Sequence, residues 1–229
     1  MFEVLSDVIQ YYMQNFSYIS QEFFRHFLMA AYGVLFAAIV AIPLGITIAR
    51  FGRLSNWGIQ LANIIQTIPH LAMLSIFMIA MGLGANTVVV ALFFYSILPI
   101  VKNTYTGIVN VDQVLLDSGK AMGMTKGQLL RMVEIPLALS VIMAGLRNAL
   151  VIAIGIVAIG AFFGAGGLGD IIIRGTNVTD GTAIILAGAI PTALMAIITD
   201  LIMGTLEKLL HPVKSVKDDK ENVDHAAPA

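Results

Sequence analysis

The residues Asp117–Pro136, DSGKAMGMTKGQLLRMVEIP, form the one extended polar and charged interruption between the apolar blocks of this chain. Particular residues within this stretch are separated by fixed numbers of residues. Gly123 lies six residues after Asp117, and Val133, Ile135 and Pro136 follow ten to thirteen residues after Gly123. The apolar blocks on either side of this stretch set the fold, and the stretch itself organises them into two groups.

Composition indicates an integral membrane protein. Of the 229 residues, 58% are hydrophobic and only 12% are charged, and the mean hydropathy is +0.88, which is well outside the range of a soluble domain of this length. The net charge of −1 and the lack of a basic face with interleaved aromatics exclude a nucleic-acid partner. The chain has no cysteine, and its four histidines are scattered without metal-ligand spacing, so no metal site is expected.

The apolar blocks predict an all-α fold with about five transmembrane helices. Residues 1–21 place apolar side chains at helical spacing between polar ones, so we expect an amphipathic helix in the membrane interface. Residues 22–210 are expected to form the transmembrane domain. The tail, 211–229, is rich in charges and is expected to be disordered. Each predicted span is about as long as, or longer than, the ~20 residues that cross a ~30 Å hydrocarbon core. The spans are 27–49, 58–83, 87–105, 139–163 and 182–206.

The distribution of Lys and Arg predicts the orientation in the membrane. With five spans and with residues 112–136 in the cytoplasm, ten of the thirteen basic residues, Lys102 among them, fall on the cytoplasmic side. Arg25 and Arg174 fall outside. Arg147 lies within the fourth span, where it either pairs with Asp200 or extends to the cytoplasmic surface. We therefore expect a multi-pass protein of the cell membrane with its N-terminus outside and its C-terminus inside.

Four polar residues of the second predicted span are spaced at i, i+3, i+4 and i+7, which places them on one face of a continuous helix. Polar groups are costly in hydrocarbon and usually face a bundle interior or a water-filled path. We expect this face either to line a translocation pathway or to form a hydrogen-bonded seam between helices. The four residues are Asn63, Gln66, Thr67 and His70.

Glycines cluster after the fourth predicted span and formally match the dinucleotide pattern G-x-G-x-x-G. That pattern binds a nucleotide only within a βαβ unit, which this chain lacks, so nucleotide binding is excluded. Because glycine lets the backbone turn sharply and pack closely, the cluster is expected to line an outer gate or to form a structural turn. Prolines within the spans are expected to kink them, as hinges or as fixed bends. The glycines are Gly164, Gly166, Gly167 and Gly169, and the prolines are Pro43, Pro69, Pro99 and Pro191.

The spacing within Asp117–Pro136 resembles the coupling loop of ABC-importer permeases, whose pattern is E-A-A, three residues, G, nine residues, I-x-L-P. Gly123 and Pro136 match it in type and spacing, whereas Asp117-Ser118-Gly119 stands in place of E-A-A. Ser and Gly are poorer helix formers than Ala, so the first half of the loop is expected to be less rigidly helical. The resemblance implies that residues 112–136 contact an ATPase; the candidate contact residues are Asp117, Ala121, Gly123, Met124, Lys126 and Pro136.

Residues 20–210 as a whole resemble the permease subunit of ABC importers of the glycine betaine, carnitine and choline class. The resemblance implies the type I importer fold, a second permease chain that is identical or homologous, ABC ATPase subunits and an extracytoplasmic substrate-binding protein. The chain lacks the P-loop G-x-x-x-x-G-K-[ST]. We therefore expect a non-catalytic subunit without a cofactor, with ATP and Mg²⁺ on the partner ATPase. The resemblance is carried by the Gly-rich stretch and by Gln66–Pro69, Met122–Thr125, Ile135–Ala138 and Ala144–Arg147.

Other functions remain open. A permease for methionine or another amino acid would share the five-span core and the coupling loop. An ion-coupled secondary transporter would be expected to show inverted repeats, and a channel a filter motif, and neither is evident. The single tryptophan, Trp57, lies at the predicted cytoplasmic edge, where interfacial tryptophans belong. An aromatic cage for a quaternary ammonium group is therefore expected on the binding protein.

Overall fold

The computed structural model describes residues 2–210, with the side chains of residues 2, 52–58 and 61 outside the description. Over this range the chain is all-helical, as predicted, and no strand is present. The predicted disordered tail, 211–229, and the side chain of Trp57 lie outside the described residues.

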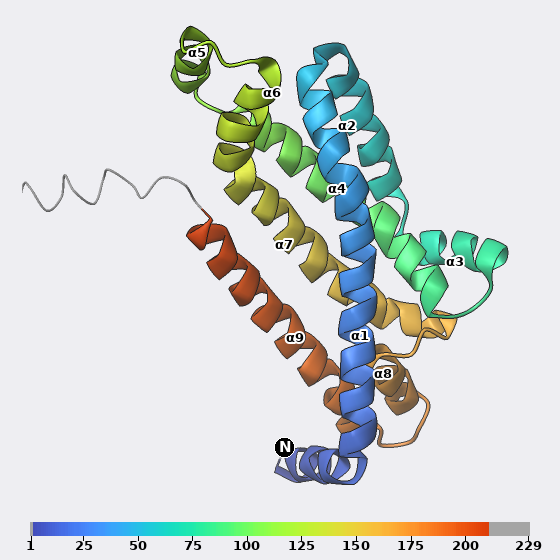
Figure 1. Cartoon of the computed structure of the whole chain (residues 1–229). Helices are drawn as coiled ribbons and strands as arrows, with labels where there is room; N and C mark the ends of the chain where they lie inside the picture. The colour runs from blue at the N-terminus through green and yellow to red at the C-terminus, as the bar shows by residue number, and fades with distance from the viewer. Residues whose placement is uncertain (1, 211–229) are drawn as a thin grey trace, which may run out of the picture.

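The first helix, α1 (Phe2–Arg50), contains a break at Asn15, whose backbone leaves the helical region at φ −119° and ψ 19°. Figure 1 shows the segment before this break lying across the end of the long shaft that follows it. Leu5, Ile9 and Met13 of that first segment are exposed apolar side chains, which suits a helix lying in a membrane interface. The break comes earlier than the predicted boundary at residue 21, and the shaft begins earlier than the predicted span at residue 27.

Within the described residues, four helical stretches are long and apolar enough to cross a membrane. They are α1, α4 (Ala85–Val109), the continuous helix over residues 126–163, and α9 (Thr182–Leu209). These stretches correspond to four of the five predicted spans. The continuous helix begins at residue 126, 13 residues before the predicted start at 139. Lys102 was counted with the cytoplasmic residues although it falls within the predicted span 87–105, and it lies inside α4.

The second predicted span, 58–83, is two shorter helices rather than one. α2 (Gly52–Thr67) has 16 residues and α3 (His70–Met81) has 12, and Figure 1 shows α3 running across the direction of α2. A proline disfavours the α conformation in the residue before it, and Ile68 is accordingly extended, at φ −69° and ψ 126°. The hydroxyl of Tyr95 donates to the freed carbonyl of Ile68. Pro69 therefore separates two helices, whereas Pro43, Pro99 and Pro191 lie inside helices as predicted.

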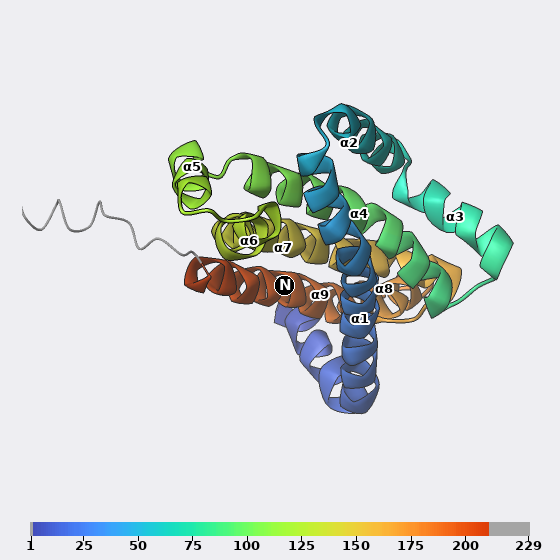
Figure 2. The same cartoon turned by 45° about the horizontal axis from the view of Figure 1, so that its top comes forward.

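The long helices form a layer that α1 crosses on one face. α9, α7 (Ile135–Gly160) and α4 lie side by side, with α2 and α3 beyond α4 (Figure 2). α1 packs along α4, α7 and α9, and the apolar residues between them are fully buried. Gly45 of α1 lies so close to α4 that a Cβ there would stand 2.7 Å from the Cβ of Thr104. This contact fixes which face of α4 points toward α1.

Short helices mark the two ends of the molecule. α5 (Gln113–Ala121) and α6 (Lys126–Leu129) lie at one end, and α8 (Leu168–Thr176) lies at the other, near the N-terminal segment (Figure 1). A π-helical turn, η1 (Leu130–Glu134), joins α6 to α7, and a 3-10 turn, η2 (Ala161–Phe163), ends the helix that starts at Lys126. The sequence did not predict α8, because its nine residues are too few for a clear periodic pattern.

Candidate functional site

The predicted coupling stretch folds into its own compact element, which we call the coupling element (residues 112–136). Asp112 caps α5, accepting a hydrogen bond from the Val114 amide at 2.8 Å. Asp117 accepts hydrogen bonds from Lys120 and from Gln113, each at 2.9 Å. The Lys120 bond, followed by the Gln113 bond, lowers the pKa of Asp117. This exposed carboxylate is therefore charged at neutral pH.

Gly123 reverses the chain between α5 and α6. The Met124 amide donates to the Gly119 carbonyl at 3.1 Å, and the Gly123 amide donates to the Lys120 carbonyl at 2.9 Å. This pair of bonds is the Schellman arrangement, in which the residue after the helix adopts a left-handed conformation that favours glycine. Gly123 has φ +80°. The turn between α5 and α6 therefore requires a backbone conformation that favours glycine at position 123.

The second half of the coupling element is continuous with a membrane span. Thr125 and Gln128 form a capping box at the start of α6, and the helix then runs on through η1 and α7 to residue 163. In η1 the Ile135 amide bonds to the Leu130 carbonyl, five residues back. This wider turn precedes Pro136, which cannot donate to the carbonyl four residues before it. α6, η1 and α7 therefore form one continuous helix.

An ion pair joins the coupling element to the end of α1. Nη2 of Arg50 lies 3.0 Å from both carboxylate oxygens of Glu134 and 3.4 Å from the Lys126 carbonyl. Glu134 is buried, and the Arg50 side chain is 30% exposed. This pair was not predicted from the sequence, in which Arg50 was interpreted only as a cytoplasmic charge. A glutamate between the apolar residues Val133 and Ile135, together with an arginine that ends an apolar run, was the available signal.

The residues predicted to contact the ATPase lie together on this element. Asp117, Ala121, Gly123, Lys126 and Pro136 are exposed, and Met124 is half-buried. Large apolar side chains are exposed around them: Val114, Met122 and Met132 are 70%, 72% and 63% exposed. Exposed apolar groups beside charged ones on the same element are typical of a surface that a protein partner or lipid covers.

The four residues predicted to share a helical face are separated by the break at Ile68–Pro69. Thr67 ends α2, and its hydroxyl donates to the Ile64 carbonyl at 2.7 Å. His70 begins α3, and its ring centroid lies 4.4 Å from that of Tyr95. The predicted single face is therefore wrong, because the helix that it requires ends at Thr67.

Asn63 and Gln66 instead join polar residues of α4 and α7 around a cavity of about 440 Å³. We call this set the polar face. α4 also contributes Leu98 and Pro99 to the lining of this cavity. The polar face consists of Asn63, Gln66, Lys102, Asn103, Thr106 and Asn148.

Arg147 pairs with two carboxylates beside the polar face. It donates to Asp200 at 2.6 and 2.7 Å and to Glu207 at 3.3 Å. The pairing with Asp200 is one of the two predicted arrangements, and the Glu207 contact was not anticipated. The three residues line a second cavity of about 290 Å³, which shares Asn148 with the first. We call them the Arg147 triad.

The Gly-rich loop between η2 and α8 is held by buried polar groups of α1. Gly167, at φ +80°, directs its amide to the carboxylate of Glu22. The Leu168 amide donates to Nδ1 of His26 at 3.2 Å, and Nε2 of His26 lies 2.9 Å from the Ile154 carbonyl. Because Nδ1 accepts, His26 is neutral with its proton on Nε2. Glu22 and His26 therefore fix the loop to both α1 and α7.

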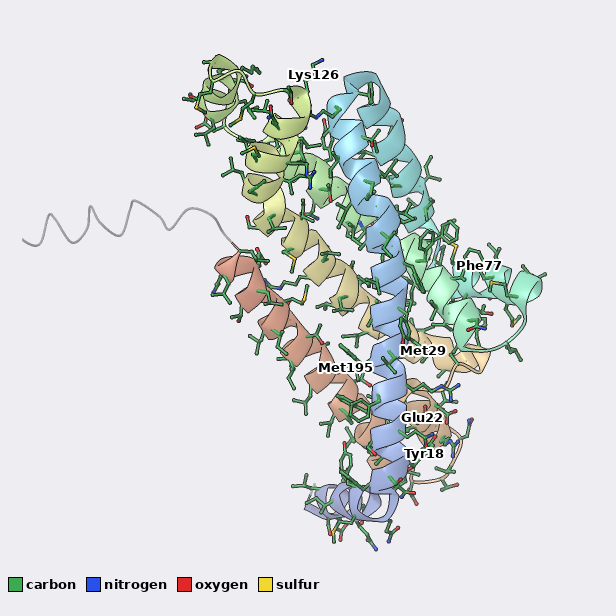
Figure 3. The ribbon with its side chains drawn as sticks, in the orientation of Figure 1. Tyr18, Glu22, Met29, Phe77, Lys126 and Met195 are labelled. Atoms are coloured by element: carbon green, nitrogen blue, oxygen red, sulfur yellow. The ribbon has the colours of Figure 1, made fainter. Side chains whose placement is uncertain are left out.

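Further contacts extend this attachment along α8. The Tyr18 hydroxyl donates to Asp170 at 2.7 Å, and Arg174 donates to the same carboxylate at 2.8 Å while lying over the Tyr18 ring. Figure 3 shows Tyr18 and Glu22 on the side of α1 that faces α8. Arg25 lies 3.8 Å from the Glu22 carboxylate. The site formed by Glu22, Arg25 and His26 was not predicted from the sequence, although their spacing of i, i+3 and i+4 in an apolar helix was a usable signal.

The predicted gate glycines all lie in or next to this loop. Gly164, Gly166 and Gly167 have positive φ, and Gly169 packs against the backbone of Ala158 on α7. Among residues 2–210, no three His, Asp or Glu side chains are placed to hold a metal ion.

Long apolar helices around a polar face, with an extramembrane element continuous with one span, define a membrane transport permease. The sequence profile of the family "Binding-protein-dependent transport system inner membrane component" matches residues 41–212, well over half of the chain. The chain belongs to this family. It is therefore a permease subunit, which is a non-catalytic role, and the ion-coupled transporter and channel alternatives are set aside.

Named relatives are similar over nearly the whole chain. The carnitine transport permease protein OpuCD of Listeria monocytogenes serotype 1/2a (strain 10403S) is 70% identical over 213 residues, 93% of this chain and 96% of that protein. The glycine betaine/carnitine/choline transport system permease protein OpuCD of Bacillus subtilis (strain 168) is 69% identical over 215 residues, 94% of each chain. These identities confirm the resemblance to this class of permease.

A solved structure shares the fold. A chain of the MetNI methionine ABC transporter, in inward-facing conformations (CY5 native crystal form), superposes with a TM-score of 0.76, covering 84% of this chain and 95% of that one. The two sequences are 18% identical, so the likeness concerns the fold alone. It confirms the predicted type I importer architecture.

Proposed function

We propose that this chain forms half of the translocation pathway of an importer for quaternary ammonium osmoprotectants such as glycine betaine, carnitine and choline. The names of the relatives support the solute class. The observation that carries the pathway assignment is the polar face: polar side chains from three helices converge on one cavity within the membrane-spanning layer. Cavities of a few hundred cubic ångström suit small ligands.

The polar face points away from α1. Thr104 faces α1 at Gly45, and successive residues of an α-helix are rotated by about 100°. Lys102 and Thr106, each two residues from Thr104, therefore lie on the opposite side of α4. Backbone and polar groups at membrane depth must be covered by protein or water. A second permease chain, identical or homologous, would cover this face and enclose the pathway between the two chains.

The two ends of the molecule would meet different partners. ABC ATPase subunits, which bind ATP and Mg²⁺, would contact the exposed surface of the coupling element in the cytoplasm. The extracytoplasmic substrate-binding protein would dock at the end that holds α8. The chain would then lie in the cell membrane with its N-terminus outside and its C-terminus inside, embedded in lipid.

Transport would link nucleotide state to the opening of the pathway. Closure of the ATPase dimer would push α6, and the continuous helix to residue 163 would carry this motion to the Gly-rich loop at its far end. There Gly164, Gly166, Gly167 and Gly169 would act as the outer gate, held to α1 by Glu22 and His26. Because binding equilibria are reciprocal, a loaded binding protein at the outer end would in turn favour ATPase closure.

The test is uptake by the complete reconstituted complex. Proteoliposomes with both permeases, the ATPase and the binding protein should accumulate radiolabelled glycine betaine only with internal ATP. Labelled methionine serves as the control for the alternative solute class. Accumulation of methionine in place of glycine betaine, carnitine and choline would overturn the proposed solute class.

A further inference from the structure

Lys102 is a positive charge inside a membrane-spanning helix, and no described acidic residue lies within ion-pair distance of it. It precedes the end of α4 at Val109 by seven residues, which is about 10 Å along the helix axis. Ionisable groups at such positions usually pair with one another or mark the path of a substrate. The Lys102 side chain is exposed, so its charge is open to an anionic partner from outside the described part of the chain.

The surroundings of Lys102 favour a partner in the pathway over a lipid phosphate. Most of its neighbours around the cavity are amides and a hydroxyl, from Asn63 and Gln66 on α2, Asn103 and Thr106 on α4, and Asn148 on α7, and Leu98 and Pro99 complete the lining. A lipid-facing lysine extends along apolar side chains toward the head groups. Lys102 instead lies in a polar cavity, where an incoming solute would meet it.

A net negative group lies beside this cavity. The Arg147 triad has two carboxylates and one guanidinium, and both carboxylates are bonded to Arg147. The triad thus carries one more negative than positive charge. Asn148 lines both the cavity of Lys102 and the cavity of the triad. Separated positive and negative sites in adjoining cavities are complementary to a zwitterion.

We propose that the polar face binds a zwitterionic solute during its passage, with the solute carboxylate on Lys102 and its cationic group toward the Arg147 triad. The inference rests on the proposed function and specifies its chemistry. Glycine betaine and carnitine carry both charges, whereas choline carries only the cation. A quaternary ammonium group has no N–H to donate, so charge and methyl contact alone orient it, and the carboxylate supplies the directional bond at Lys102.

The experiment compares Lys102→Met with Lys102→Arg in the complete reconstituted complex. Methionine keeps the length of the side chain without its charge, and arginine keeps the charge. The measured quantities are ATP-driven uptake of labelled glycine betaine and choline, and the ATPase rate with binding protein loaded with each solute. We expect Lys102→Met to lower glycine betaine uptake roughly tenfold or more, the effect of one lost charge-assisted hydrogen bond.

Three companion results are expected. Lys102→Met should still hydrolyse ATP in response to loaded binding protein, because the coupling element is unchanged. Lys102→Arg should keep most of the glycine betaine uptake, and any choline uptake of the wild-type complex should survive in Lys102→Met. Failure of the wild-type complex to transport any of these solutes would instead contradict the proposed function, before any variant is compared.

Other outcomes overturn the proposal. Wild-type uptake of glycine betaine by Lys102→Met would show that the charge is not used. Joint loss of uptake and of stimulated ATP hydrolysis in Lys102→Met would assign Lys102 to the contact with the second permease, as a structural ion pair. An equal loss of choline and glycine betaine uptake in Lys102→Met would show that Lys102 does not bind the carboxylate of the solute.

Discussion

Gly123 is required by its backbone conformation rather than by the space around it. It has φ +80°, and a Cβ placed on it would meet nothing within 4 Å in this chain. Residues with a Cβ lose about 1–2 kcal/mol in the left-handed region, and Asn tolerates it best. A partner that packed directly on the glycine would add a second requirement, namely the absence of any Cβ. The two requirements can be separated by substitution.

We predict that Gly123→Val inserts in the membrane but loses glycine betaine uptake and the stimulation of ATP hydrolysis by loaded binding protein. Valine is β-branched and cannot adopt this turn without strain, so α6 is misdirected. Gly123→Asn is the matched control. If only the backbone matters, Asn retains uptake within a few-fold; if an ATPase packs on the glycine itself, Asn fails as well. Wild-type uptake by Gly123→Val would remove residues 112–136 from the coupling role.

Among the elements, the ends of α1 and α7 are tied by the Arg50–Glu134 pair. Glu134 is buried while Arg50 is partly exposed, so the pair is worth more than a surface ion pair and less than a fully buried one. We predict that Glu134→Gln lowers the unfolding free energy of the complex by about 1–2 kcal/mol, because Arg50 loses its charged acceptor. Thermal unfolding of the purified complex measures this change.

Asp117→Asn is the control for that measurement, since Asp117 and Lys120 are both exposed and their pair contributes little to stability. The double variant Arg50→Met, Glu134→Leu removes both charges together and should recover part of the lost stability. A Glu134→Gln complex that unfolds at the wild-type temperature would show that the pair does not join α1 to the coupling element.

Element positions could be predicted from the sequence where one local signal decided them. The four long apolar stretches were found because burial in lipid needs only length and hydropathy. The break at Ile68 could not be found in this way, because the prolines at 43, 99 and 191 lie inside helices without ending them. At Pro69 the outcome depends on a distant group, the Tyr95 hydroxyl, which takes the freed carbonyl.

The residues of the candidate site also fall into those that a local sequence pattern predicts and those that depend on distant neighbours. The coupling residues follow one another in the sequence, so a spacing pattern sufficed to locate them. Lys102, Asn148 and Glu22 matter through neighbours that other helices supply, and no local pattern reports those contacts. The predicted face of Asn63, Gln66, Thr67 and His70 assumed a continuous helix, and it divided where that assumption was wrong.

At the scale of the whole molecule, the two ends differ in charge. The end with the coupling element (Figure 1) holds four basic residues, Arg50, Lys120, Lys126 and Arg131, and three acidic ones, Asp112, Asp117 and Glu134. The end with α8 holds two basic residues, Arg25 and Arg174, beside the acidic Glu22, Asp170 and Asp180. Basic residues near spans are retained on the cytoplasmic side. The charge asymmetry therefore predicts that the coupling element faces the cytoplasm, where an ATPase would find its nucleotide.

This orientation predicts where introduced thiols can be labelled in intact cells. The chain has no native cysteine, so Ser6→Cys and Leu209→Cys each give a single thiol. Ser6 lies in the N-terminal segment, and Leu209 is 76% exposed at the end of α9. A membrane-impermeant maleimide should modify Cys at position 6 in intact cells and Cys at position 209 only after permeabilisation.

This difference requires an odd number of membrane crossings. Since four long helices can each cross once, α2 and α3 must together supply the fifth crossing. Labelling of both thiols in intact cells would mean that α2 and α3 do not cross together, and the reverse pattern would place the coupling element outside, away from any source of ATP.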